Sequence, residues 1–254
     1  MIHGGGLNIL LFKTIADMLD EEQPVYGMQA RGLSRPAELL YTIEEIAAVY
    51  VREIMDVYPN GPYLLTGYSL GGIIAFEMAR QLRNLGKKIK FLGAVDTYAG
   101  NLKSVVDSTS KVTKKVKRQF HKIPFFTKAF IEHPKETLVY QWNYVKNKIN
   151  KPLPAKIKSQ DNYFTPYEQS IMDSYDIAVD NYAMPADDFQ VDLFRVNKRI
   201  YYIDDQVYLG WDKFAKKGVK IHVVPGDHRT FLHPPNDREF AAILQTALDK
   251  AAEN

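Results

Sequence analysis

Short apolar runs alternate with stretches of helical periodicity along most of this 254-residue chain. Runs of β-branched and other apolar residues, bounded by glycine, proline or charged residues, are typical of buried parallel strands. They cover residues 63–66, 88–95, 191–196 and 219–224, with weaker candidates at 24–28 and 199–203. Apolar residues at helical spacing predict helices over 9–19, 43–57, 73–82, 170–182 and 237–251. Strands that alternate with helices predict an α/β fold with a mostly parallel central sheet flanked by helices.

This alternation stops between about residues 100 and 188. Helical, basic and aromatic segments replace it, with helix candidates at 111–122 and 137–149. An insertion of this size after a sheet strand is typical of a lid over an active site. We therefore expect a single domain over residues 1–254, with a helical lid insertion at 100–188.

Charge is distributed unevenly, although the net charge is only +3. Residues 103–158 contain fourteen Lys or Arg and three acidic residues, a net charge of +11, while the remaining chain carries 19 basic and 27 acidic residues. Such a segment can steer acidic partners, and no nucleic-acid recognition motif accompanies it. The chain has no cysteine, which excludes thiolate chemistry and suits a reducing cytoplasm. No stretch of roughly 18 apolar residues predicts a membrane helix, so we expect a cytoplasmic protein that binds neither nucleic acid nor membrane.

The sequence GYSLG at residues 67–71 stands where a predicted strand gives way to a predicted helix. This is the G-x-S-x-G nucleophile elbow in the context that the motif requires. Glycines flank the serine because the strand and helix backbones pass close to it. The turn exposes the Ser69 hydroxyl above the sheet and directs the unpaired N–H groups of the helix N-terminus toward a developing oxyanion. Ser69 is therefore the candidate nucleophile.

A serine hydroxyl needs a base, and His228 is the candidate because it follows the last predicted strand behind a Pro-Gly turn. The chain order Ser, acid, His is that of an elbow hydrolase. Two strand ends can supply the acid that orients the imidazole. Asp96 follows the strand after the elbow, and Asp204 or Asp205 follows the next candidate strand. Topology alone leaves the choice of acid open.

Residues 1–6, MIHGGG, place a glycine cluster at the expected mouth of the sheet. Its backbone N–H groups are free to face a ligand, as in an HGGG-type oxyanion loop. We expect His3 to help shape this loop.

Four sequence blocks together resemble the type I thioesterase domain that ends nonribosomal peptide and polyketide synthases. They are YGMQARGL at 26–33, GYSLGG at 67–72, Asp96, and PGDHRTFL at 225–232. The resemblance covers nearly the whole chain and is weakest in the predicted lid. It implies an α/β-hydrolase fold, with Asp96 as the acid and the backbone N–H groups of Leu70 and Gly5 as oxyanion donors. In the family a strand leads into the glycine loop, whereas here only Met1 and Ile2 precede His3.

The resemblance also implies a reaction and a partner. An acyl or peptidyl chain moves from the phosphopantetheine arm of a carrier protein onto Ser69, and leaves by hydrolysis or by attack of an internal nucleophile. No metal or organic cofactor is implied. Carrier proteins are commonly acidic, so the basic segment would attract them. The alternatives are a type II editing thioesterase, a free-standing carboxylesterase or lipase, and a hydrolase-fold binding protein that has lost its chemistry.

Overall fold

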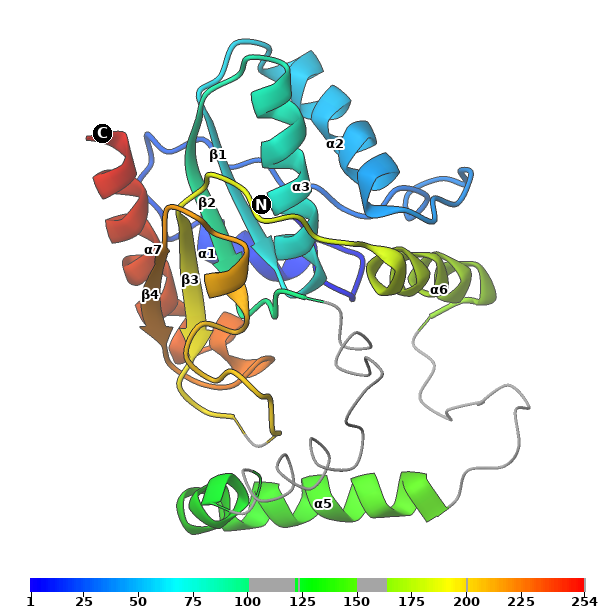
Figure 1. The fold of residues 1–254 in the computed structure, drawn as a ribbon, viewed down its shortest axis with the longest axis vertical. Coiled ribbons are helices and arrows are strands. Elements are labelled where there is room, and N and C mark those ends of the chain that lie inside the picture. Colours follow the sequence, from blue (N-terminus) through cyan, green and yellow to red (C-terminus); the bar gives the residue numbers. More distant parts are fainter. Residues whose placement is uncertain (101–121, 123, 150–163, 200, 254) are drawn as a thin grey trace.

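The computed structural model describes residues 1–100, 122, 124–149, 164–199 and 201–253. In this part of the chain, four strands form one parallel sheet in the order β1-β2-β3-β4. They are β1 (Tyr63–Tyr68), β2 (Ile89–Val95), β3 (Val191–Val196) and β4 (Val219–Val224). The prediction of an α/β fold with a parallel sheet flanked by helices is confirmed (Figure 1).

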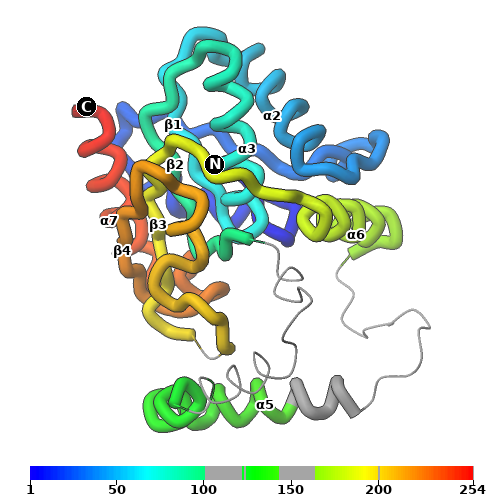
Figure 2. Tube along the Cα trace, viewed as in Figure 1, coloured from blue at the N-terminus to red at the C-terminus, as the bar shows by residue number. Residues whose placement is uncertain are grey.

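Helices cover both faces of this sheet (Figure 2). On one face, α2 (Ile43–Val57) and α3 (Leu70–Asn84) pack with α6 (Pro166–Asn181) in one apolar core. On the other, α1 (Lys13–Ala16) and α7 (Asn236–Ala252) build a second core. Strands β1, β2 and β3 are largely buried, which is why their sequences are mostly apolar, whereas β4 at the edge is only partly buried.

The register of the sheet places the ends of neighbouring strands side by side. Tyr68 pairs with Val95, and Val95 pairs with Phe194. The residues that follow these pairs continue the alignment, because the N–H of Ser69 donates to the Val95 carbonyl at 2.9 Å and that of Asp96 donates to the Phe194 carbonyl at 2.7 Å. Function in such sheets collects at the carboxyl ends of the strands, and here two candidate site residues lie there next to each other.

Helical segments lie beyond this end of the sheet. Residues 124–132 are helical and are followed by α5 (Pro134–Ile149), which lies below the strand ends in Figure 1. The helix predicted at 137–149 lies within α5, and the helix predicted at 111–122 lies outside the described residues except for Lys122. The α6 helix begins earlier than predicted because Thr165 forms a capping box with Glu168.

Three sequence predictions are wrong in extent or kind. The 24–28 segment makes a single bridge, between Met28 and Ile2, and Ile2 in turn bridges Gly67 of β1. Among the described residues of 199–203 none is in a strand, since β4 already pairs with β3 on the side where a fifth strand would have to add. The helix predicted at 9–19 is limited to a 3-10 turn, Leu10–Phe12, and the four residues of α1.

Candidate active site

Ser69 occupies the sharp turn between β1 and α3. Its φ of +53° and ψ of −119° lie in a region that a non-glycine residue enters at a cost of about 1–3 kcal/mol. A Cβ on Gly67 would overlap the carbonyl of Gly71, and a Cβ on Gly71 would lie 2.6 Å from the Ile2 oxygen. The strand, the helix and the N-terminal glycine loop therefore meet in direct backbone contact, which holds Ser69 in this conformation.

His228 and Asp96 form a close pair beside this turn. The Nδ1 of His228 lies 2.6 Å from Oδ2 of Asp96, whose side chain is completely buried. An ionised carboxylate can only accept, so we assign the proton to Nδ1, which leaves Nε2 as the basic nitrogen. Burial raises the pKa of Asp96, but the hydrogen bond from His228 and the charge of Arg199 outweigh it and hold that pKa below its ordinary value. The pair is thus a carboxylate that orients an imidazole.

No described residue hydrogen-bonds the Ser69 hydroxyl, and this includes His228. The loop of His228 nevertheless packs against the end of β1, because the ring of Tyr68, the residue before Ser69, lies 5.1 Å from the His228 ring. Hydrogen bonds between nucleophile and base are often absent without substrate and form in the complex. The structure therefore brings the three predicted residues to one place, with the serine hydroxyl unengaged.

Tyr68 fixes the loop that carries the base, a role that sequence reasoning did not assign. Its hydroxyl donates to the main-chain oxygen of His228 at 2.6 Å. Asp227 shapes the same loop, since its Oδ1 accepts from the N–H groups of Arg229 and Thr230 at 2.9 and 3.0 Å. The sequence showed only that an aromatic residue, Tyr68, precedes the nucleophile. Its contact with the loop of the base became clear from the structure.

Asp205 has a different task from Asp96. Its carboxylate accepts from the N–H groups of Val207, Tyr208 and Gly210 at 2.8 to 3.0 Å. Burial raises its pKa, and these backbone hydrogen bonds lower it further than burial raises it. Asp205 therefore closes its own turn, and the carboxylate in contact with His228 is that of Asp96.

Arg199 is the second partner of Asp96, and sequence reasoning missed it. Its Nη2 lies 2.5 Å from Oδ1 of Asp96, and its side chain is 10% exposed. The guanidinium also donates to the Tyr201 hydroxyl at 2.7 Å and lies 5.0 Å from the centre of that ring. Because residues 199–203 were predicted to form a strand, a contact between the Arg199 side chain and the carboxylate of Asp96 was not expected.

Two backbone N–H groups near the serine are unused. In the described part of the chain, neither Leu70 at the start of α3 nor Gly5 in the glycine loop donates a hydrogen bond. Their position at a helix N-terminus and in an exposed glycine turn suits donation to a developing negative charge. The assignment of these two N–H groups as oxyanion donors stays a prediction.

His3 anchors the glycine loop to two helices, as expected of a residue that shapes it. It is fully buried, with Nδ1 2.7 Å from the Gly4 carbonyl and Nε2 2.8 Å from the Tyr50 hydroxyl. A carbonyl only accepts, so Nδ1 carries the proton and Nε2 accepts from Tyr50. The Tyr50 hydroxyl lies in turn 2.9 Å from that of Tyr175. This chain of contacts connects the loop to α2 and α6.

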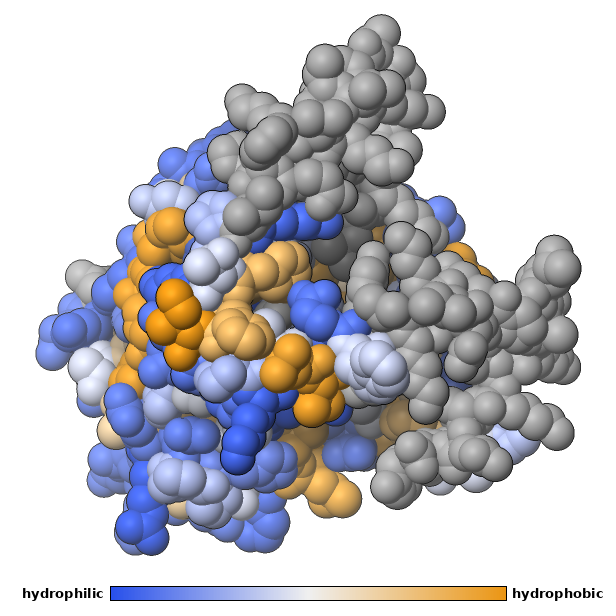
Figure 3. All heavy atoms as spheres, turned by 90° about the horizontal axis from the view of Figure 1, so that it is seen from below, coloured by the Kyte–Doolittle hydropathy of each residue, from blue (hydrophilic) through white to orange (hydrophobic). Residues whose placement is uncertain are grey.

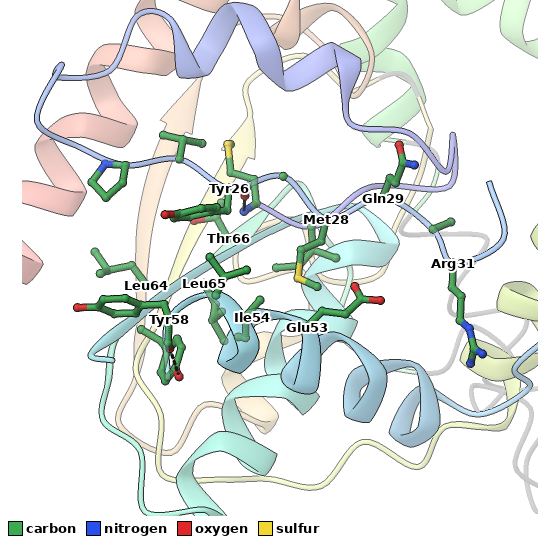
Figure 4. A pocket seen from close by; sticks show the side chains of 18 of the residues that line it. Tyr26, Met28, Gln29, Arg31, Glu53, Ile54, Tyr58, Leu64, Leu65 and Thr66 are labelled. Carbon is green, nitrogen blue, oxygen red and sulfur yellow. Dashed lines mark hydrogen bonds between the residues drawn. The ribbon is translucent and has the colours of Figure 1, made fainter. Parts of the chain in front are cut away.

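A cavity of about 940 Å³ lies apart from these residues, at the outer edge of β1. Leu64, Leu65 and Thr66 of β1 line it, together with Ile54 of α2 and Met28 (Figure 4). None of the three candidate catalytic residues contributes to its wall. The cavity therefore belongs to the edge of the sheet and not to the candidate active site.

The described residues contain no cluster of three or more His, Cys, Asp or Glu side chains that could hold a metal ion. None of the helices in that part of the chain is long and apolar enough to cross a membrane.

A family model of sequences and the folds of solved structures both match this chain to thioesterase domains. Residues 1–248 match the family model described as the thioesterase domain. An inactive atromentin synthetase, invA3 of Paxillus involutus, is 37% identical over 99 residues, which are 39% of this chain and 10% of that protein. A non-reducing polyketide synthase of Pseudevernia furfuracea is 27% identical over 234 residues, which are 89% of this chain and 11% of that protein. The chain thus spans about a tenth of the length of these curated relatives.

Solved structures share its fold. A four-domain nonribosomal peptide synthetase matches 96% of the chain with a TM-score of 0.66 and 24% identity, over 19% of its own length. The NocB thioesterase domain, in covalent complex with a fluorophosphonate nocardicin G analogue, matches 97% of the chain over 92% of its own length, with a TM-score of 0.64 and 20% identity.

Proposed function

This chain belongs to the thioesterase domain family, and we propose that it releases an acyl or peptidyl chain from the phosphopantetheine thioester of a carrier protein through an acyl-Ser69 intermediate. The observation that carries the proposal is the 2.6 Å contact between His228 and Asp96, beside a serine on a strained strand-to-helix turn. That arrangement supplies a nucleophile, a base with a free basic nitrogen, and a carboxylate that orients the base.

The first half of the reaction loads the serine. Nε2 of His228 takes the proton of the Ser69 hydroxyl as the oxygen attacks the thioester carbonyl. The resulting oxyanion accepts from the N–H groups of Leu70 and Gly5, each of which contributes about 3 kcal/mol of transition-state stabilisation. Collapse of the tetrahedral intermediate breaks the carbon–sulfur bond, and the imidazolium returns its proton to the leaving pantetheine thiolate.

The second half frees the product. Water, or a hydroxyl or amine of the bound chain, attacks the acyl ester while His228 again takes the proton. Hydrolysis and cyclisation differ only in this nucleophile. Asp96 remains ionised throughout and stabilises the imidazolium. The chemistry requires no metal or organic cofactor, because the carrier protein brings the substrate on its own phosphopantetheine arm.

In this proposal the helical residues 124–149, within the insertion of residues 100–188, serve as a lid over the strand ends, whereas α6 belongs to the apolar core. A salt bridge of 2.9 Å between Glu136 of α5 and Lys198 ties this segment to the loop after β3. Seen from this end, the surface carries apolar patches among polar ones (Figure 3). Several apolar side chains of the two helical segments are exposed, namely Phe130, Ile131, Leu138, Val139 and Trp142. Such side chains suit contact with an apolar acyl chain.

The basic charge of this segment supports a carrier-protein partner. Much of residues 103–158 lies outside the described residues, so the argument rests on the sequence. A net charge of +11 raises the encounter rate with an acidic partner that delivers a phosphate-bearing arm. Raising the salt concentration should therefore increase KM for a carrier-bound substrate and leave KM for a free acyl-pantetheine nearly unchanged.

Intact-mass measurement after mixing with an acyl-pantetheine thioester tests the reaction. Wild type should gain an acyl adduct or release product, and Ser69→Ala should do neither. Asp96→Asn should slow turnover by about 10⁴-fold, because it supports the wrong tautomer of the imidazole. Asp205→Asn is the matched control, since it changes a carboxylate that contacts only its own turn, and its turnover should stay close to that of wild type.

Other outcomes would assign the chain differently. Loss of turnover in Asp205→Asn with normal turnover in Asp96→Asn would favour an editing thioesterase that uses the later acid. Equal rates on simple esters and on pantetheine thioesters would favour a carboxylesterase. Identical behaviour of all four proteins would refute serine catalysis here.

A further inference from the structure

The buried carboxylate of Asp96 has a separate partner for each of its two oxygens. Oδ2 accepts from Nδ1 of His228 at 2.6 Å, and Oδ1 accepts from Nη2 of Arg199 at 2.5 Å. The N–H of Val196 also points at Oδ1, at the long distance of 3.5 Å. In a serine hydrolase triad the acid needs only to contact the base, so a buried cation on its other oxygen calls for an explanation.

Arg199 is held in place from two directions. One arm of its guanidinium contacts Asp96, while Nη1 donates to the Tyr201 hydroxyl at 2.7 Å. The guanidinium also lies 5.0 Å from the centre of the Tyr201 ring, within the range of a cation–π contact. With 10% of its side chain exposed, this arginine is far more sequestered than a surface ion pair. Its charge therefore acts on Asp96 with little screening by solvent.

We propose that Arg199 is a positioning residue that fixes the orientation of Asp96 and sets the pH below which His228 ceases to act as a base. This inference rests on the proposed function of the same site. A buried carboxylate without a second cation would stabilise the imidazolium more strongly. His228 would then stay protonated to higher pH, and the pH range in which it can accept a proton from Ser69 would be narrower. The guanidinium neutralises the carboxylate, so the imidazole stays neutral to lower pH while the hydrogen bond still orients it.

Other charged and titratable groups lie around this pair on the neighbouring elements. Tyr68 of β1 and Tyr201 after β3 interact electrostatically with Asp96. Asp227, Arg229, Lys198 and Tyr140 of α5 interact with those tyrosines or with Asp227. Among the described residues, only Arg199 and His228 form ion pairs with Asp96. The guanidinium is therefore the group whose removal changes the charge at the carboxylate directly.

The pH dependence of kcat/KM on an acyl-pantetheine thioester tests this role. Arg199→Met removes the charge and keeps the length of the side chain. The acid limb of its pH profile, where kcat/KM falls as His228 takes up a proton, should move up by about one pH unit. Arg199→Lys retains a positive charge without the planar fork, so its limb should stay within about 0.3 unit of wild type while its plateau falls several-fold. Arg229→Met is the matched control, because it removes an exposed arginine near His228 that makes no contact with Asp96. Its limb should stay in place.

A merely structural arginine gives a different result. Its loss would lower the rate equally at every pH and leave the acid limb where it is in wild type, and that outcome would overturn the proposal. If Arg199→Met does not fold, Arg199→Gln takes its place, and the position of the acid limb of its kcat/KM profile is compared with wild type in the same way. NMR titration of the His228 ring in Ser69→Ala, with and without Arg199→Met, gives the answer without any turnover. An upward shift of about one pH unit in the ring titration would support the role of Arg199 even if the proposed reaction fails, and no shift would refute it.

Discussion

Lowering the pH from 7 to 5 should destabilise this protein through His3. Burial lowers the pKa of His3 from an ordinary 6.5 to about 4, against a smaller opposite effect of its hydrogen bond to the Gly4 carbonyl. Between these two values the unfolded chain binds more protons at His3 than the folded chain, so stability falls as the pH falls. The two values give a loss from His3 of about 2 kcal/mol between pH 7 and pH 5, and about 3 kcal/mol by pH 4.

The structural reason is burial, because the ring is closed off from solvent and an imidazolium there would lose its hydration. Nε2 must be unprotonated to accept from the Tyr50 hydroxyl, while Nδ1 donates to the Gly4 carbonyl. Protonation turns both nitrogens into donors inside a site that offers no solvent. The glycine loop that carries the proposed oxyanion donor Gly5 is attached to this ring, so activity should fall near pH 4, where His3 of the folded protein takes up a proton.

Urea unfolding at pH 7 and pH 5 measures the effect. His3→Gln cannot titrate, so wild type should lose about 2 kcal/mol more between the two pH values than this variant does. His233→Gln removes an exposed imidazole and should show the wild-type loss. Equal losses in wild type and His3→Gln would refute the reasoning, because they would mean that His3 titrates alike in the folded and unfolded chains.

Two further predictions concern packing. Gly71→Ala should lower the free energy of unfolding by about 1–2 kcal/mol, because a methyl group there overlaps the main chain of His3 and this cost exceeds the gain in helix propensity. Gly6→Ala is the control, since the space around Gly6 is open. Its stability in thermal unfolding should stay within about 0.5 kcal/mol of wild type. Equal melting temperatures of the two variants would contradict the steric argument. Tyr182→Phe should cost about 1.5–3 kcal/mol, since it removes a buried 2.7 Å hydrogen bond to the carboxylate of Glu77. A melting temperature equal to that of wild type would show that this bond contributes nothing net.

The strands of the sheet could be predicted because burial leaves a mark in the sequence. Three of the four runs are bounded by glycine, proline or a charged residue, while 191–196 lies between Gln190 and Asn197. The observed strands agree with the predicted ones to within two residues. The other two candidates, residues 24–28 and 199–203, have the composition of strands. A strand also needs a hydrogen-bonded partner along its length, and among the described residues of these two segments only Met28 forms a bridge.

The choice between Asp96 and Asp205 shows the limit of sequence reasoning about the site. Both carboxylates follow apolar runs, and their residue types are the same. Their hydrogen bonds distinguish them. Asp205 accepts from three backbone N–H groups of its own turn, whereas Asp96 contacts a histidine 132 positions away in the chain. The arginine beside Asp96 could not be predicted either, since its contact spans 103 positions and depends on the chain leaving the sheet after β3.

The cavity beside β1 has a consequence for the behaviour of the protein in solution. β1 is the edge strand of the sheet, and within the described chain only Ile2 bridges its outer side, opposite Gly67. An edge that ends against an apolar hollow is a template for any extended polypeptide, including a second molecule of the same kind. Copies that meet there would gain main-chain hydrogen bonds and cover Leu64 and Ile54 at once.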